Sequence, residues 1–153
     1  MSMPRRTWLG WLAAAVGLPL AAPAQGGGGR VALVVGQSRL PGGGAVASAA
    51  ADARLMEQAL QQAGFSVERL DDPDVGDLRA ALAQLGARLR ASPGLGLLHY
   101  SGAGFAQPEP GGYAEFWMWC AAAHASLPGA KAAMAHAVPL RDVWQLVDPG
   151  VDR

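Results

Sequence analysis

The chain has 153 residues, which is enough for one domain of ordinary size and too few for two. Hydrophobic residues make up 51% of it and aromatic residues only 7%, so we expect a core built from leucine, valine and alanine. The formal net charge is zero and no basic run or patch is present, which argues against nucleic acid as a partner.

The N-terminal segment has the pattern of an export signal. Arg5 and Arg6 precede a short apolar run, and Ala22-Pro23-Ala24 forms an A-x-A cleavage site. The run is shorter than the ~20 residues that cross a bilayer, so no permanent membrane span is expected. We therefore predict a signal peptide over residues 1–24 and an exported protein, periplasmic or secreted. The paired arginines leave the twin-arginine and the general secretory routes open.

A glycine-rich linker, residues 25–29, leads into the predicted domain over residues 30–153. Strands are predicted near Val31–Gly36, Phe65–Leu70 and Leu95–Tyr100. The first is a continuous apolar run, typical of a strand buried on both faces, and the third is also apolar. The second alternates at first, as a strand near a sheet edge does. Helical segments separate the strands, and this order implies parallel pairing.

The two helices are predicted over residues 48–63 and 76–91. Ser48 is the expected N-cap of the first helix, and Gly64 is its expected stop. The side chains expected on one face of the first helix are Leu55, Met56, Ala59, Leu60 and Ala63, and those of the second are Leu78, Leu82, Leu85 and Leu89.

The last third of the chain is less regular. It contains an aromatic segment, Tyr113–Cys120, and a predicted short helix, Pro139–Val147, with Pro139 in its first turn. The apolar face of that helix holds Leu140, Val143, Trp144 and Val147. Ligands of parallel sheets bind at the carboxyl ends of the strands, so the chemistry is expected in the loop of residues 101–104.

Four stretches together resemble the caspase family, particularly its bacterial metacaspase-like members. They are similar to the opening strand R-x-A-L-V-I-G-N-x, the N-D-A helix, the G-F-x-V strand and the Y-x-G-H-G-x element of that family. The corresponding residues are Arg30–Ser38, Asp52-Ala53 with Met56 and Leu60, Gly64–Val67, and Tyr100–Phe105. The resemblance implies a three-layer α/β fold with a mainly parallel central sheet, its first strand between the other two and its C-terminal end incomplete.

The resemblance also assigns candidate site residues. Ala103 stands where the family has the histidine that acts as general base, and a methyl group cannot accept a proton. The backbone amide of Gly104 matches one that forms the oxyanion hole in the family. A glycine at this position also suits a tight turn. Asp52 matches an acid that lines the pocket for a basic substrate residue. Alternatively, Asp52 has only a structural role, because the helix dipole favours a negative charge in the first turns of a helix.

Three histidines and one cysteine are the other candidates for catalysis or metal binding. His99 lies about 13 Å along the strand from residue 103, and we interpret it as a partly buried histidine near a sheet edge. Cys120 and His124 are spaced so that a helix would bring them together, but the apolar surroundings favour a structural cysteine. Neither His124 nor His136 has an acidic or thiol cluster around it, so no metal and no cofactor are expected.

The sequence therefore predicts a domain of a cysteine-endopeptidase family, whose members cleave peptide or protein substrates, that is itself inactive. The D-A-C-R-like element that carries the family's nucleophile does not occur before Arg153. One alternative is an exported, non-catalytic interaction domain with a protein partner. A nucleotide-binding module, drawn from Gly36 and Gly42–Gly44, is a weaker alternative because no G-x-G-x-x-G or P-loop lysine is present.

Overall fold

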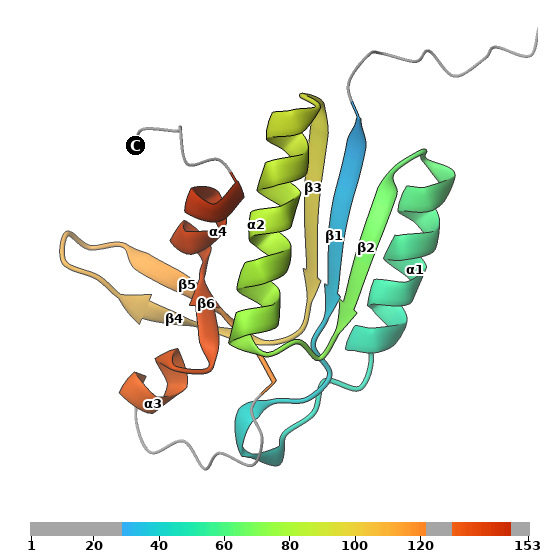
Figure 1. Ribbon diagram of the computed structural model, residues 1–153. Coiled ribbons are helices and arrows are strands. Elements are labelled where there is room, and N and C mark those ends of the chain that lie inside the picture. The colour runs from blue at the N-terminus through green and yellow to red at the C-terminus, as the bar shows by residue number, and fades with distance from the viewer. Residues whose placement is uncertain (1–28, 122–129, 148–153) are drawn as a thin grey trace, which may run out of the picture.

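The structure, a computed structural model, describes residues 29–121 and 130–147 (Figure 1). At its centre lies a parallel sheet with the order β2-β1-β3, formed by β1 (Arg30–Gly36), β2 (Ser66–Asp71) and β3 (Leu95–Ser101). These bounds and the parallel pairing confirm the three predicted strands and the central place of the first.

The sheet is covered by one long helix on each face, because the side chains of β1 point alternately to the two sides. Leu33 and its neighbours at every second position pack in one buried cluster with α2 (Val75–Ala91). Ala32 and Val34 pack in a second cluster with α1 (Ala49–Gln62). The three-layer α/β arrangement is confirmed (Figure 1).

The buried face of α1 differs from the predicted one. Ala49, Ala53 and Leu60 are buried, whereas Leu55 is 66% exposed. The reason is a close approach of the helix to the end of β1: a Cβ added to Gly36 would lie 2.8 Å from the Cβ of Ala53. Small side chains are required there, so the helix turns its alanines inward. Of the predicted face, Leu60 is buried and Met56 is half-buried, whereas Leu55, Ala59 and Ala63 are exposed.

The N-termini of α1 and α2 are capped differently. Ser48 stands at the N-cap position of α1, as predicted, but its backbone is helical and its side chain makes no capping hydrogen bond. Asp74 caps α2, with its carboxylate accepting a hydrogen bond from the Asp77 amide at 2.8 Å. Gly64 has a φ of 83°, which confirms it as the residue that ends the first helical segment. The predicted leucine face of α2 is also confirmed.

After β3 the chain builds a second, antiparallel sheet that the sequence did not predict. Strands β4 (Gly104–Pro108) and β5 (Ala114–Trp119) form a hairpin, and β6 (Ala137–Pro139) pairs with β5. Phe105 stacks on Trp117 with 5.9 Å between ring centroids, so the aromatic segment stabilises the hairpin. Helix α3 (Ala130–Met134) precedes β6.

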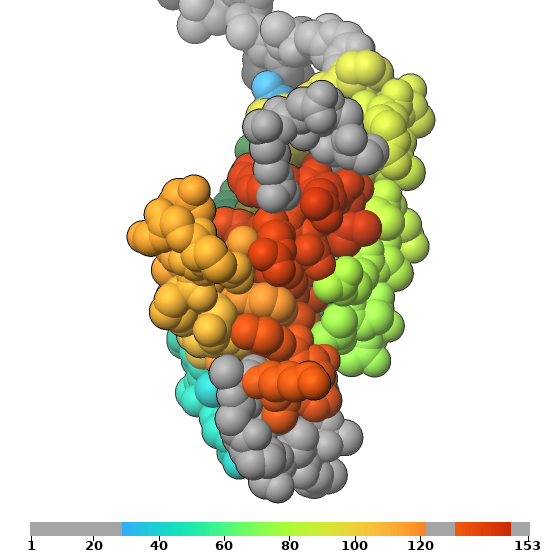
Figure 2. Space-filling model, turned by 90° about the vertical axis from the view of Figure 1, so that its left-hand side faces the viewer, coloured from blue at the N-terminus to red at the C-terminus, as the bar shows by residue number. Residues whose placement is uncertain are grey.

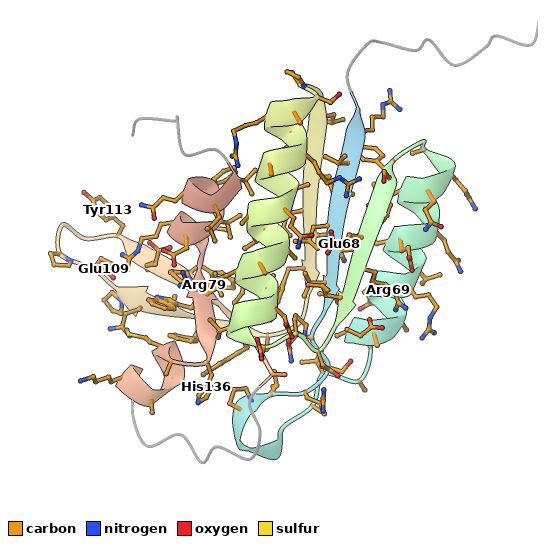
Figure 3. All side chains as sticks on the ribbon, in the orientation of Figure 1. Glu68, Arg69, Arg79, Glu109, Tyr113 and His136 are labelled. Carbon is orange, nitrogen blue, oxygen red and sulfur yellow. The ribbon has the colours of Figure 1, made fainter. Side chains whose placement is uncertain are left out.

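Helix α4 (Leu140–Val147) packs against α2 and confirms the last predicted helix, except that Pro139 ends β6 instead of lying in the first helical turn. An ion pair at 2.5 Å joins Arg79 of α2 to Asp142 of α4, and Figure 3 shows Arg79 extending from α2 toward this part of the chain. Within the described ranges, no helix combines the length and apolar character needed to cross a membrane.

We predict that Asp74→Ala lowers the free energy of unfolding by about 1 kcal/mol, because the Asp77 amide loses its acceptor at the helix end. Ser48→Ala is the matched control and should change stability by only a few tenths of a kcal/mol, since Ser48 makes no such bond. Urea unfolding followed by circular dichroism measures both. Equal losses in the two variants would contradict the assignment of the caps.

Candidate functional site

The candidate site lies at the carboxyl edge of the parallel sheet, where the three strands end at the same level. Gly36 is the register partner of both Asp71 and Ser101. The loops that follow are joined by backbone hydrogen bonds of 2.8 Å, from the Gln37 amide to the Ser101 carbonyl and from the Asp72 amide to the Gly36 carbonyl. Three segments far apart in the sequence therefore meet here.

Asp72 fixes the loop after β1, a role that sequence reasoning missed. Its Oδ1 accepts hydrogen bonds from the amides of Ser38 and Arg39, both at 2.7 Å, and its Oδ2 pairs with the Arg39 guanidinium at 3.1 Å. Asp72 has a φ of 51°, the left-handed conformation that aspartate tolerates better than most residues. The available signal was its place directly after a strand at the carboxyl edge.

Asp52 reaches the same edge from the first turn of α1. The Ser101 hydroxyl donates to its Oδ2 at 3.3 Å, so the structure brings Asp52 to the end of β3. An exposed carboxylate beside this loop suits a positively charged group of a ligand. Its role in a pocket for a basic residue stays a prediction.

The loop that carries Ala103 is shorter than the predicted residues 101–104, because Ser101 ends β3 and Gly104 begins β4. Its shape is held by Tyr100, whose hydroxyl lies 2.9 Å from the carbonyl oxygen of Ala103 and 2.7 Å from that of Trp119. Burial, and to a lesser extent the nearby Cys120 thiol, raises the pKa of Tyr100. The phenol therefore stays protonated as a hydrogen-bond donor.

Gly104 lies so close to β5 that a side chain at this position would not fit. A Cβ on Gly104 would lie 2.4 Å from the carbonyl oxygen of Trp117. The Trp119 amide donates to the Ala103 carbonyl at 3.2 Å, and Gly104 pairs with Met118 at the next position. Because hydrogen-bonded and open pairs alternate in an antiparallel ladder, the Gly104 amide points away from β5. That orientation suits an anion-binding donor, and the oxyanion role stays a prediction.

Cys120, the only cysteine of the chain, is fully buried in the α2-side core. Burial raises the pKa of its thiol to about 12, with a further rise from Asp74 that Arg79 partly offsets. A thiol with this pKa is a poor nucleophile at neutral pH because it is almost never ionised. The structure thus favours the structural interpretation of Cys120.

Among the described residues, no histidine forms a catalytic pair with Cys120. Cys120 follows β5 and does not begin a helix, while His124 lies outside the described residues. His136 accepts a backbone hydrogen bond from the Cys120 amide at 2.9 Å through its carbonyl oxygen, and its side chain lies beside β6 (Figure 3). His99 is half-buried on β3, as predicted, and its Nε2 has no partner among the described residues.

Two further features concern ligands. In the part of the chain that the structure describes, no group of three His, Cys, Asp or Glu side chains is placed so that it could hold a metal ion. The Gly42–Gly44 segment forms the end of a short turn, η1 (Pro41–Gly43), which is closed by a bridge between Arg39 and Ala45. Residues 45–48 separate it from α1, so these glycines do not open a helix.

The model of the caspase domain family matches residues 29–138, more than half of the 153-residue chain. The chain therefore belongs to the caspase domain family, a family of peptidases that act on protein substrates. The family expected from the sequence is confirmed. Comparison with the curated proteins finds no match.

We predict that Cys120 resists alkylation in the folded protein. A rise of its pKa from 9.0 to about 12 lowers the thiolate fraction at about pH 8 on the order of a thousandfold. Iodoacetamide labelling followed by mass spectrometry should be slow in buffer and fast in denaturant. Leu55→Cys in a Cys120→Ala background is the control, because Leu55 is exposed and its replacement should react readily. Equal rates at the two positions would contradict the assignment.

Proposed function

We propose that this protein is a catalytically silent member of the caspase family that binds protein or peptide segments without cutting them. The observation that carries this proposal is Ala103, whose methyl group occupies the position that matches the family's general base. General-base assistance is worth ~10²–10⁴-fold, so its loss removes a large part of the rate.

The surroundings of Ala103 support the proposal. Side chains that lie near it are chemically unsuited to replace an imidazole: the Tyr100 phenol is protonated and holds the loop, and the Ser101 hydroxyl is hydrogen-bonded to Asp52. The buried Cys120 thiol is protonated as well. Two groups at this site can still bind a ligand: the amide of Gly104, which points away from β5, and the carboxylate of Asp52, which lies beside the loop.

An interaction role follows from the same features. A loop with an amide donor that points away from β5 and a nearby carboxylate can bind the backbone and a basic side chain of a peptide without any acyl transfer. The proposed ligand is accordingly a peptide segment with an arginine or lysine, which Asp52 would attract. The exposed Asp52 should contribute modestly, as partly solvated ion pairs do.

We predict no turnover of fluorogenic peptides that carry Arg, Lys or Asp before the scissile bond. Ala103→His should gain no activity, because the only cysteine is buried and protonated; Ala103→Ser is its matched control. Wild-type and Cys120→Ala samples should give the same background rate. Turnover that disappears in Cys120→Ala would overturn the proposal.

We also propose that the protein is exported, as Arg5, Arg6 and the A-x-A site at Ala22-Pro23-Ala24 suggest. The expected mature N-terminus lies near Gln25, which N-terminal sequencing of the exported protein checks. Replacing Arg5 and Arg6 with lysine should block export only on the twin-arginine route, and Arg54→Lys in the domain should have no effect. Finding the intact chain in the cytoplasm, with Met1 or its aminopeptidase product at the terminus, would contradict export.

A further inference from the structure

Strand β4 forms one edge of the antiparallel sheet, which has the order β4-β5-β6. Two hydrogen bonds show which of its backbone groups face β5. Just before the strand, the Trp119 amide donates to the Ala103 carbonyl at 3.2 Å. Just after it, near the tip of the hairpin (Figure 3), the Glu109 amide donates to the Tyr113 carbonyl at 2.9 Å. Because hydrogen-bonded and open pairs alternate, the odd-numbered residues of β4 face β5 and the even-numbered residues face outward.

The outward positions of β4 are Gly104, Ala106 and Pro108. Proline has no N–H, so the edge offers two amide donors, those of Gly104 and Ala106, and ends at Pro108. Within residues 29–121 and 130–147, no hydrogen bond reaches the backbone groups of Gly104 or Ala106. The strand, GFAQP, holds no charged residue that would protect the edge, and both donor positions have small residues, so a second backbone can come close.

This edge begins at the candidate site. The Gly104 amide matches the oxyanion donor of the family, so a ligand carbonyl bound there already lies at the first position of the edge. The Ala106 amide lies two residues further along, which is about 7 Å in a strand, and Ala106 is exposed. Figure 2 shows the β4–β5 hairpin at the margin of the molecule, beside α4. A ligand that binds Gly104 can therefore continue along β4.

We propose that the peptide bound at the candidate site continues along β4 as an added strand, which pairs with the backbone groups of Gly104 and Ala106. This inference rests on the proposed function, because the Gly104 amide belongs to both. It also gives the ligand a direction: the basic side chain lies at the Asp52 end, beside Ser101, and the paired residues run from there toward Pro108. Main-chain hydrogen bonds supply affinity in strand addition, and neighbouring side chains supply specificity.

The side chain next to the edge defines the peptide further. The ligand residue between the two paired ones lies opposite Phe105, and side chains at the same level of neighbouring strands share a face. Phe105 is half-buried, and its ring stacks on Trp117 with 5.9 Å between centroids. A fixed aromatic surface therefore meets this ligand residue, which we expect to be large and apolar.

The shortness of the edge favours a peptide over a second copy of the domain. Each copy would contribute two pairing residues, Gly104 and Ala106, and Pro108 stops the ladder of hydrogen bonds. Such a contact is small beside the ~1,200–2,000 Å² that stable protein interfaces bury. An extended peptide can contact Asp52 and β4 together.

The test removes one outward amide and leaves the hairpin bonds in place. Ala106→Pro deletes a donor of the edge, and β4 already holds a proline at its next outward position, Pro108. Ala106→Ser keeps the donor and is the matched control. Ala114→Pro on β5 controls for the effect of a proline on the hairpin, because Ala114 forms an open pair with Pro108 and its amide faces away from β4. Near-UV circular dichroism checks that the aromatic packing of each variant is kept.

The probe is a peptide selected from a display library of random decapeptides on the purified full chain. Ala106→Pro should weaken its binding about tenfold, because one hydrogen bond is lost, whereas Ala106→Ser and Ala114→Pro should leave it unchanged. Asp52→Asn should weaken binding by removing the partner of the basic residue. N-methyl groups on alternate amides of the peptide should abolish binding in one phase and not in the other, because only every second amide faces β4.

The outcomes separate this inference from the proposed function. Binding that Asp52→Asn weakens and Ala106→Pro does not would overturn the added strand and leave the proposed function standing. Binding that Ala106→Pro alone weakens would support the added strand and contradict the role of Asp52. No enrichment of peptides, equal effects of the two methylation phases, or a dimer that Ala106→Pro dissociates would each overturn the inference.

Discussion

Strand β1 has to exclude water from both of its faces, and the rest of the architecture follows from that requirement. Residues 31–35 are all buried, with alternate members facing two separate clusters. One cluster needs a leucine-rich helix, which α2 supplies, and the other needs a helix with small residues that can come close, which α1 supplies. A parallel strand on each side completes the burial of the backbone, because its polar groups then have partners without water.

The positions of the loops that form the candidate site also depend on β1. Because β2 and β3 are both in register with β1, their ends lie beside Gly36, and the loops after them are linked by backbone hydrogen bonds. The Asp72 carboxylate then fixes the loop after β1, and the Tyr100 hydroxyl fixes the loop after β3, each through contacts to backbone groups. The position of Asp52 next to Ser101 depends in turn on the close packing of α1 against the end of β1.

Sequence periodicity was sufficient for the strands of the parallel sheet and for the face of α2, where burial follows the large apolar side chains. It misled at α1, because the closeness of the helix to Gly36 selects alanines over Leu55. The hairpin was missed since its stability comes from pairing between residues such as Phe105 and Trp117, which periodicity within one segment does not reveal. Asp72 was missed for the same reason: its partners lie more than thirty positions away.

The hydroxyl of Tyr100 has a consequence for how this domain tolerates change. It holds the carbonyl oxygens of Ala103 and Trp119, and the side chain of residue 103 has no part in these contacts. The backbone of the loop is thus specified independently of the group that decides whether chemistry is possible there. Selection to keep these two contacts would then place no constraint on the side chain of residue 103, so a lineage could exchange that side chain while the contacts stay under constant selection.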